Sequence, residues 1–197
     1  MNGFYKETDE IYRLKVPFDD LYTSVFLIKT QHGYLLLDSA TTDIDVDDYI
    51  TPALSELGVE LKDIKTIVIT HPHSDHAGGL SRLLYHLPHA EVVREMRKLS
   101  DSLMTYPLPG HTKDFVGLLD LRSKTLISGD GLQGAGVGKY RCSVADREGY
   151  LNTLQRIRAD TRVENLLFSH AYEPWYCDKM IGRENVILCL AECEKYI

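Results

Sequence analysis

The chain is poor in cysteine, and the few cysteines it has lie in its C-terminal third. They are Cys142, Cys177, Cys189 and Cys193. This number and placement exclude a disulfide-stapled scaffold, so we expect reduced thiols. Cys189 and Cys193 are spaced as neighbours on one helix face. A metal pair is conceivable there, but no second pair matches it, and packing of buried thiols is the favoured interpretation.

Positive charge and long hydrophobic runs are also scarce. The chain has 22 Lys and Arg against 29 Asp and Glu, with a formal net charge of −7. Phosphate binding needs clustered basic residues, so this balance argues against nucleic acid as a partner. Residues 1–7 lack the apolar core of a signal peptide, and no apolar run approaches the length of a membrane span. We therefore expect a cytoplasmic protein with no membrane partner.

Hydrophobic residues make up 44% of the 197 positions, enough for one domain spanning residues 1–197. Alternating patterns predict strands over 11–16, 24–29, 33–38, 64–70, 91–93, 115–120, 124–128 and 165–168, with turns at 31–33 and 122–123. Helical spacing predicts helices over 47–57, 77–86, 146–159 and 181–196. Residues 94–106 show no clear pattern. The strands fall into two groups, each with helices around it, which indicates an α/β class.

The most informative segment is His71-Pro-His73-Ser-Asp75-His76. It follows an apolar strand pattern at 67–70 and precedes Ala-Gly-Gly at 77–79. Four side chains able to bind a metal, gathered in a loop that leaves a strand, are poorly explained by packing. The segment predicts a metal site.

Three further candidate ligands stand at predicted strand ends. His111 precedes one strand, while Asp130 and His170 each follow one. Taken singly, each has an ordinary explanation: a surface loop, an Asp-Gly turn and a strand cap. Together with residues 71–76 they give five histidines and two aspartates, a set sufficient for two metal ions.

In this order the motifs resemble those of the metallo-β-lactamase superfamily. The resemblance rests on a strand ending in Asp38, the 71–76 loop, Gly-His-Thr at 110–112, Ser-Gly-Asp at 128–130 and a strand-end His170. It covers nearly the whole chain. It implies a four-layer αββα sandwich with the metals at one rim.

The resemblance also implies a ligand set. The first metal would be held by His71, His73 and His111, the second by Asp75, His76 and His170, and Asp130 would bridge them. Two divalent ions are implied, with zinc the default and iron or manganese compatible with the same ligands. A hydroxide shared by the ions would be the nucleophile, and Asp75 would take or relay a proton. Asp38 and Thr112 would lie behind the ligands, with Asp38 orienting them.

The ligand identities separate the branches of the superfamily. Asp130 argues against β-lactamases, which generally carry cysteine or serine there, and His73 argues against flavodiiron proteins, which carry glutamate. Only residues 171–197 follow His170, so the helical extension of glutathione thioesterases is not expected, and the acidic balance disfavours transfer RNA phosphodiesterases. The implied activity is hydrolysis of a small ester, thioester or lactone.

Three other functions stay open. A phosphodiesterase or phosphate-ester hydrolase would use Lys139 and Arg141. An iron enzyme of oxygen or sulfur chemistry would hold one metal with His71, His73 and His111, or with His71, His111 and Asp130. The third possible function is that of a metal-binding protein that catalyses no reaction.

Two groups of residues are candidates for contact with the substrate, and each group has a second interpretation. Lys139, Tyr140 and Arg141 end a glycine-rich stretch after Asp130, and either anchor a carboxylate or phosphate or belong to a lid. The aromatic residues after His170 either wall a substrate pocket or pack the last helix; they are Tyr172, Trp175 and Tyr176. The closing helix is a candidate homodimer surface.

Overall fold

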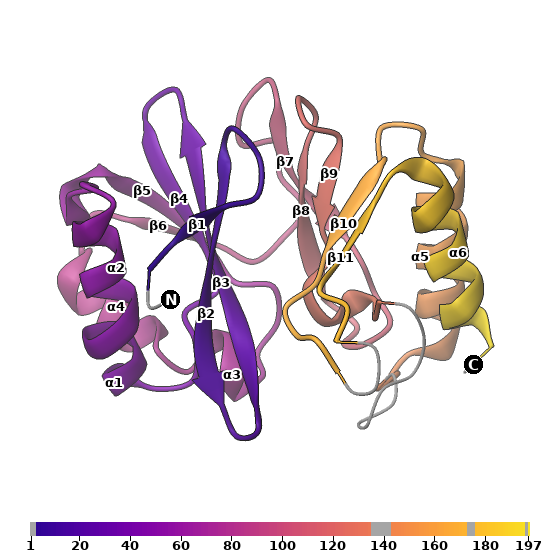
Figure 1. Cartoon of the computed structure of the whole chain (residues 1–197), viewed down its shortest axis with the longest axis horizontal. Coiled ribbons are helices and arrows are strands. Elements are labelled where there is room, and N and C mark those ends of the chain that lie inside the picture. The colour runs from indigo at the N-terminus through magenta and orange to yellow at the C-terminus, as the bar shows by residue number, and fades with distance from the viewer. Residues whose placement is uncertain (1–2, 135–142, 173–175, 196) are drawn as a thin grey trace. The chain divides into compact units, whose positions relative to one another are not determined.

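The computed structural model describes residues 3–134, 143–172, 176–195 and 197. The chain divides into two compact units, Met1–Arg94 and Glu95–Ile197. Each unit is built on one mixed sheet with helices packed against it (Figure 1). The single domain expected from the sequence stays a prediction.

The first unit contains a six-stranded sheet in the order β1-β2-β3-β4-β5-β6. Its strands are β1 (Tyr5–Lys6), β2 (Ile11–Phe18), β3 (Leu21–Thr30), β4 (Gly33–Leu37), β5 (Ile64–Val68) and β6 (Glu91–Val93). The strands β1 to β4 pair antiparallel, whereas β4, β5 and β6 pair parallel. The turn predicted at 31–33 is confirmed, because Thr30 pairs with Gly33 where β3 meets β4.

Short helices connect these strands. They are α1 (Asp43–Asp45), the π-helix η1 (Val46–Ile50), α2 (Thr51–Glu56), the 3-10 helix η2 (Leu61–Asp63), α3 (Ser74–Ala77) and α4 (Leu80–His86). The helix predicted over 47–57 is thus a π-helical turn followed by α2. Pro52 fits the first turn of α2, because the N–H groups there have no partner within the helix. The helix predicted over 77–86 begins later, at Leu80.

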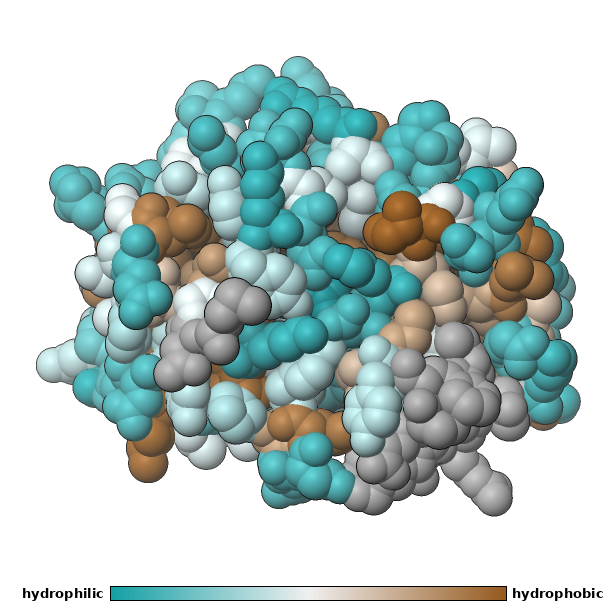
Figure 2. All heavy atoms as spheres, in the orientation of Figure 1, coloured by the Kyte–Doolittle hydropathy of each residue, from teal (hydrophilic) through white to brown (hydrophobic). Residues whose placement is uncertain are grey.

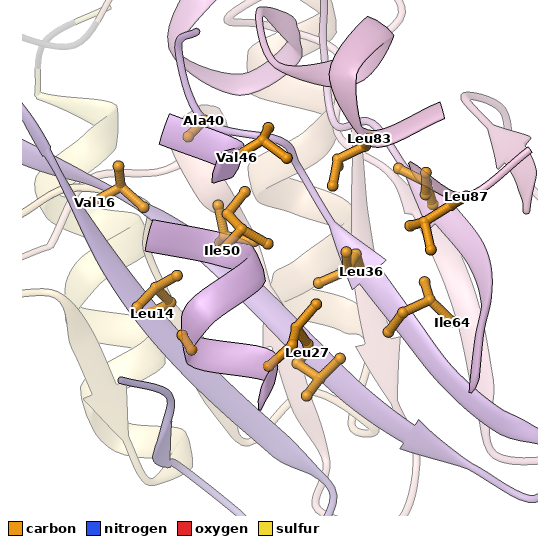
Figure 3. Packing of buried hydrophobic residues seen from close by; sticks show 14 of the residues in the cluster. Leu14, Val16, Leu27, Leu36, Ala40, Val46, Ile50, Ile64, Leu83 and Leu87 are labelled. Carbon is orange, nitrogen blue, oxygen red and sulfur yellow. The ribbon is translucent and has the colours of Figure 1, made fainter. Parts of the chain in front are cut away.

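The core of the first unit lies between one face of the sheet and these helices. Leu14, Leu27 and Leu36 from the strands point towards Val46 and Ile50, and all five side chains are buried (Figure 3). Leu14 belongs to β2, Leu27 to β3 and Leu36 to β4, so three neighbouring strands contribute to this face. The alternation along each strand therefore selects which side chains meet the helices.

Arg13 lies on the other face of β2 and is fully buried, which the sequence pattern did not predict. Its Nε atom is 2.9 Å from Oε1 of Glu7, whose side chain is 3% exposed. The guanidinium also stacks over Phe26, with Cζ 4.9 Å from the ring centroid. This ion pair ties the segment after β1 to the sheet.

The second unit contains a five-stranded sheet in the order β11-β10-β9-β8-β7. Its strands are β7 (Leu103–Pro107), β8 (Val116–Asp120), β9 (Thr125–Ile127), β10 (Asn165–Leu167) and β11 (Lys179–Ile181). Its helices are the 3-10 helix η3 (Gly129–Gly131), α5 (Arg147–Ala159) and α6 (Arg183–Glu194). Only β9 and β10 pair parallel among these neighbours. Strand β7 lies in the segment without a clear pattern, and β11 ends where a helix was expected to begin.

The core of the second unit lies between its sheet and the helices α5 and α6. Leu126 and Leu166 from the sheet join Leu154 from α5 in one buried cluster. Cys189 and Cys193 from α6 belong to the same cluster, which confirms the packing expected for these two thiols.

Hydrophobic side chains on the face seen in Figure 2 form separate small patches among hydrophilic ones. Within the described residues, no helix combines the length and apolar character needed to cross a membrane. The cytoplasmic location stays a prediction.

Replacing Glu7 with alanine should lower the free energy of unfolding by about 3 to 5 kcal/mol, because Arg13 would keep a buried charge without its carboxylate. Urea denaturation measures this change. Glu60→Ala is the matched control, since Glu60 pairs with Lys62 where both side chains are more than half exposed, and such pairs contribute less than about 1 kcal/mol. Equal losses in the two variants would contradict the role of the buried pair.

Candidate functional site

Asp38 stands at the end of β4 and is almost fully buried. Its carboxylate accepts hydrogen bonds from the Thr70 N–H at 2.8 Å and from the Thr70 hydroxyl at 2.9 Å. A third comes from His76, whose Nδ1 lies 2.8 Å from Oδ2. The backbone of Asp38 adopts a φ of 67° and donates to the Val68 carbonyl. Asp38 thus joins the ends of β4 and β5 to α3.

Thr70 fixes the orientation of the His71 ring. The Thr70 hydroxyl proton is directed to Asp38, so its oxygen accepts from the Nδ1–H of His71 at 3.0 Å. This leaves a lone pair on Nε2 of His71, which lies 2.9 Å from Nδ1 of His73. Two ring nitrogens that converge in this way need a proton or a cation between them. Their arrangement fits shared ligation of a metal ion.

Asp75 and His76 lie in the short helix α3, which begins directly after His73. The Nδ1–H of His76 is directed to Asp38, while its Nε2 is 3.0 Å from Oδ2 of Asp75. The rings of His71 and His76 have centroids 4.3 Å apart. The first unit therefore gathers all four metal-capable side chains of the loop in one place.

Two glycines hold α3 against the segment after β4. A Cβ atom at Gly78 would collide with the Thr41 carbonyl, and one at Gly79 with the Ser39 carbonyl. The Ser39 hydroxyl donates to the His76 carbonyl at 2.8 Å. The Ala-Gly-Gly sequence after the loop is thus required for close approach of two backbones.

In the second unit, His111 is held by backbone contacts. Its Nδ1 lies 2.9 Å from the Ser143 carbonyl, so the Nδ1–H donates and Nε2 keeps a lone pair. The preceding Gly110 has room for no side chain, because a Cβ atom would collide with Tyr150 of α5. The Thr153 hydroxyl of α5 donates to the Pro109 carbonyl at 2.8 Å. The helix therefore positions the loop that carries His111.

Asp130, in η3, lies between two imidazoles of the same unit. Its Oδ2 is 3.7 Å from Nε2 of His111, and its Oδ1 is 3.2 Å from Nε2 of His170. The three side chains are at most 11% exposed. Each carboxylate oxygen thus faces a different histidine, an arrangement compatible with a ligand shared by two metal ions.

The other predicted site residues have different outcomes. The Tyr172 ring centroid lies 5.5 Å from that of His170. The Thr112 hydroxyl is buried and has no hydrogen-bond partner within the described part of the chain, so its orienting role stays a prediction. Four predicted substrate contacts lie outside the described residues: Lys139, Tyr140, Arg141 and Trp175.

Each unit by itself gathers its share of the predicted ligands; that all seven form one centre stays a prediction. The sequence analysis missed two groups that orient these ligands. Thr70, a polar residue ending an apolar strand directly before His71, was a usable signal. Ser143 acts through its backbone carbonyl, which leaves no signal in the sequence.

The sequence of this chain is similar to sequences of known proteins. The model of the metallo-beta-lactamase superfamily matches residues 18–100. A hydroxyacylglutathione hydrolase of Aeromonas hydrophila is 28% identical over 82% of this chain and 70% of its own length. A beta-lactamase-like protein 2 homolog of Caenorhabditis elegans is 28% identical over 72% of this chain, which spans only 54% of that protein.

Solved structures show the same fold. The metallo beta lactamase from Erythrobacter litoralis, with beta mercaptoethanol in its active site, has a TM-score of 0.73 at 16% identity, covering 98% of this chain and 96% of its own. The mono-zinc form of FIM-1 from Pseudomonas aeruginosa has a TM-score of 0.73 at 17% identity, covering 98% and 94%. The resemblance and the α/β sandwich fold class predicted from the sequence are confirmed.

Replacing Asp38 with asparagine should weaken metal binding about 10- to 100-fold, as losses of ligand-orienting groups do. An amide has only one acceptor oxygen, so its NH₂ faces either the Nδ1–H of His76 or the N–H of Thr70 and sets donor against donor on that side, which displaces the His76 ring or the start of the loop. Competition with a chromophoric chelator measures the affinity.

Asp101→Asn is the control, because the Asp101 side chain is 96% exposed and forms an ion pair with Lys98, which is also exposed. Circular dichroism checks that both variants fold. An Asp38→Asn protein with the affinity of the control would show that His76 needs no carboxylate partner.

Proposed function

We propose that this chain, whose fold and motifs are those of the metallo-β-lactamase superfamily, is a metal-dependent hydrolase of a small ester, thioester or lactone. The observation that carries the proposal is the Asp130 carboxylate with one oxygen towards His111 and the other towards His170. Two imidazole nitrogens that both face one buried carboxylate are the arrangement expected where the three side chains share metal ions. A hydrolytic centre with two metal ions does need such a shared ligand.

The proposed centre takes two divalent ions, with zinc the expected metal. The ligands would be His71, His73 and His111 for one ion, Asp75, His76 and His170 for the other, and Asp130 for both. His71 and His111 fit this role because their Nδ1–H groups are already used, which leaves Nε2 of each ring as the ligand atom.

Bound ions would supply the reactive nucleophile by lowering the pKa of water, and would polarise the scissile bond. The protein supplies the rest. Asp38 keeps the His76 ring in place through a charged hydrogen bond. That bond also makes the other ring nitrogen a stronger electron-pair donor to a metal ion. Asp75, which ends 3.0 Å from the His76 ring, is the proposed group that takes up or relays a proton.

Thioesters are the first substrates to test. The name of the Aeromonas hydrophila relative states that it hydrolyses an acylated glutathione, in which the acyl group is bonded to sulfur. This support concerns the bond that is cleaved, since the chain matches 70% of that relative's length. Tyr172, packed beside His170, is the proposed apolar wall for the acyl group.

The metal content should be about two divalent ions per chain, with zinc predominant, when the protein is purified without an affinity tag or chelator. Elemental mass spectrometry measures the number and the element. Removal of the ions should abolish thioester hydrolysis, and zinc should restore it. One iron per chain would favour oxygen chemistry at a single-metal site, and a protein that takes up no metal would refute the proposal.

Replacing Asp75 with alanine should lower kcat about 10² to 10⁴-fold, the range that proton transfer contributes. The rate is compared at equal metal occupancy, so that a lost ligand is not mistaken for a lost proton acceptor. Asp9→Ala serves as the control, because the Asp9 side chain is 94% exposed. An unchanged rate in a metal-loaded Asp75→Ala enzyme would remove Asp75 from the mechanism.

A further inference from the structure

The Thr70 hydroxyl connects the buried carboxylate of Asp38 to the ring of His71. Thr70 is 1% exposed, and its hydroxyl oxygen lies 2.9 Å from each carboxylate oxygen of Asp38 and 3.0 Å from Nδ1 of His71. A hydroxyl has one proton to donate, and a carboxylate only accepts. The opposite arrangement would set the hydroxyl oxygen against two carboxylate oxygens with no proton between them. Asp38 therefore acts on two histidines, directly on His76 and through Thr70 on His71.

His71 and His73 form a pair whose two rings differ in burial. Nε2 of His71 lies 2.9 Å from Nδ1 of His73. His71 is 3% exposed, whereas His73 is an exposed residue. Because the proton of His71 is on Nδ1, the hydrogen between two neutral rings belongs to His73 when no metal is bound. The buried ring thus already has its lone pair on the nitrogen that would bind a metal.

This difference in burial decides which ring has to change when an ion arrives. An exposed imidazole exchanges its proton with water, so His73 can move its proton from Nδ1 to Nε2. A buried imidazole can do this only when the structure opens locally. The arrangement leaves the buried ring of His71 unchanged and assigns the change of tautomer to the exposed ring of His73.

We propose that Thr70 is a positioning residue that keeps the pair of His71 and His73 available to a metal ion. Thr70 relays the negative charge of Asp38 to His71, and the buried ring thereby stays in the tautomer whose Nε2 binds the ion. This role rests on the metal centre of the proposed function. It adds to that centre a residue that acts through a ligand rather than as one.

Thr70→Val removes the hydroxyl and nearly keeps the shape of the side chain. The Nδ1–H of His71 then faces a methyl group in a buried place, and a buried donor without an acceptor is costly. The other tautomer of His71 carries its proton on Nε2, where Nδ1 of His73 is already at hydrogen-bond distance. We expect the valine variant to shift towards this second tautomer, in which the proton of the buried ring occupies the position of the ion.

Nitrogen NMR of the metal-free protein measures the tautomer, because protonated and unprotonated ring nitrogens give separate signals. The spectra are recorded at about pH 8, where an ordinary imidazole is neutral. We expect the proton of His71 on Nδ1 in the unmodified protein and in Thr70→Ser, which keeps the hydroxyl, and a shift of that proton to Nε2 in Thr70→Val. A proton on Nε2 in the unmodified protein, or an unchanged tautomer in Thr70→Val, would overturn the proposal.

Competition between the protein and a chromophoric chelator for zinc measures the effect on metal binding. Thr70→Val should bind zinc about 10- to 100-fold more weakly, as other losses of ligand-orienting groups do, while Thr70→Ser should keep the affinity of the unmodified protein. Thr66→Val is the matched control, because it makes the same substitution earlier on the same strand, β5. Circular dichroism checks folding, and Thr70→Ala removes the same hydroxyl if the valine variant does not fold. Equal zinc affinities in Thr70→Val and the control would contradict the role of Thr70.

A double variant tests whether Asp38 acts through Thr70. Because part of the effect of Asp38 on zinc binding passes through the Thr70 hydroxyl, Asp38→Asn combined with Thr70→Val should lose less affinity than the product of the two single losses. Losses that multiply would overturn the relay.

These results are separate from the hydrolase activity. The expected tautomers and zinc affinities in a protein that cleaves no thioester would contradict the proposed function alone. Thioester hydrolysis with full zinc affinity in Thr70→Val would contradict the role of Thr70 alone.

Discussion

The buried carboxylate of Asp38 is the interaction on which the metal-capable loop of residues 71–76 depends. A carboxylate with 1% exposure is stable only when its oxygens are fully hydrogen-bonded. Its donors come from Thr70 at the end of β5 and from His76 in α3. Because one carboxylate accepts hydrogen bonds from both residues, it fixes the end of β4 relative to the loop and to α3. The positive φ of Asp38 is the local backbone cost of that arrangement.

The two units orient their histidines by different means. In the first unit, a charged acceptor holds the Nδ1–H of His76, which increases electron density on the other ring nitrogen. In the second, the neutral carbonyl of Ser143 holds the Nδ1–H of His111, and a glycine packed on Tyr150 sets the loop. The free ring nitrogen of His76 should therefore donate its electron pair to a metal ion more strongly than that of His111. A charged side chain therefore orients His76, whereas a backbone carbonyl and the packing of Gly110 orient His111.

The sequence predicted features that depend on neighbouring residues and missed those that depend on distant ones. The 71–76 loop is a short motif whose chemistry is visible in the order of its residues, and the turn at 31–33 follows from local alternation. Strand β7 was missed because its residues do not alternate between buried and partly buried positions, and β11 because it directly precedes α6, whose helical pattern was extended back to residue 181. The burial of Arg13 was missed because its partner, Glu7, belongs to another segment. The role of the Ser143 carbonyl has no side-chain signature.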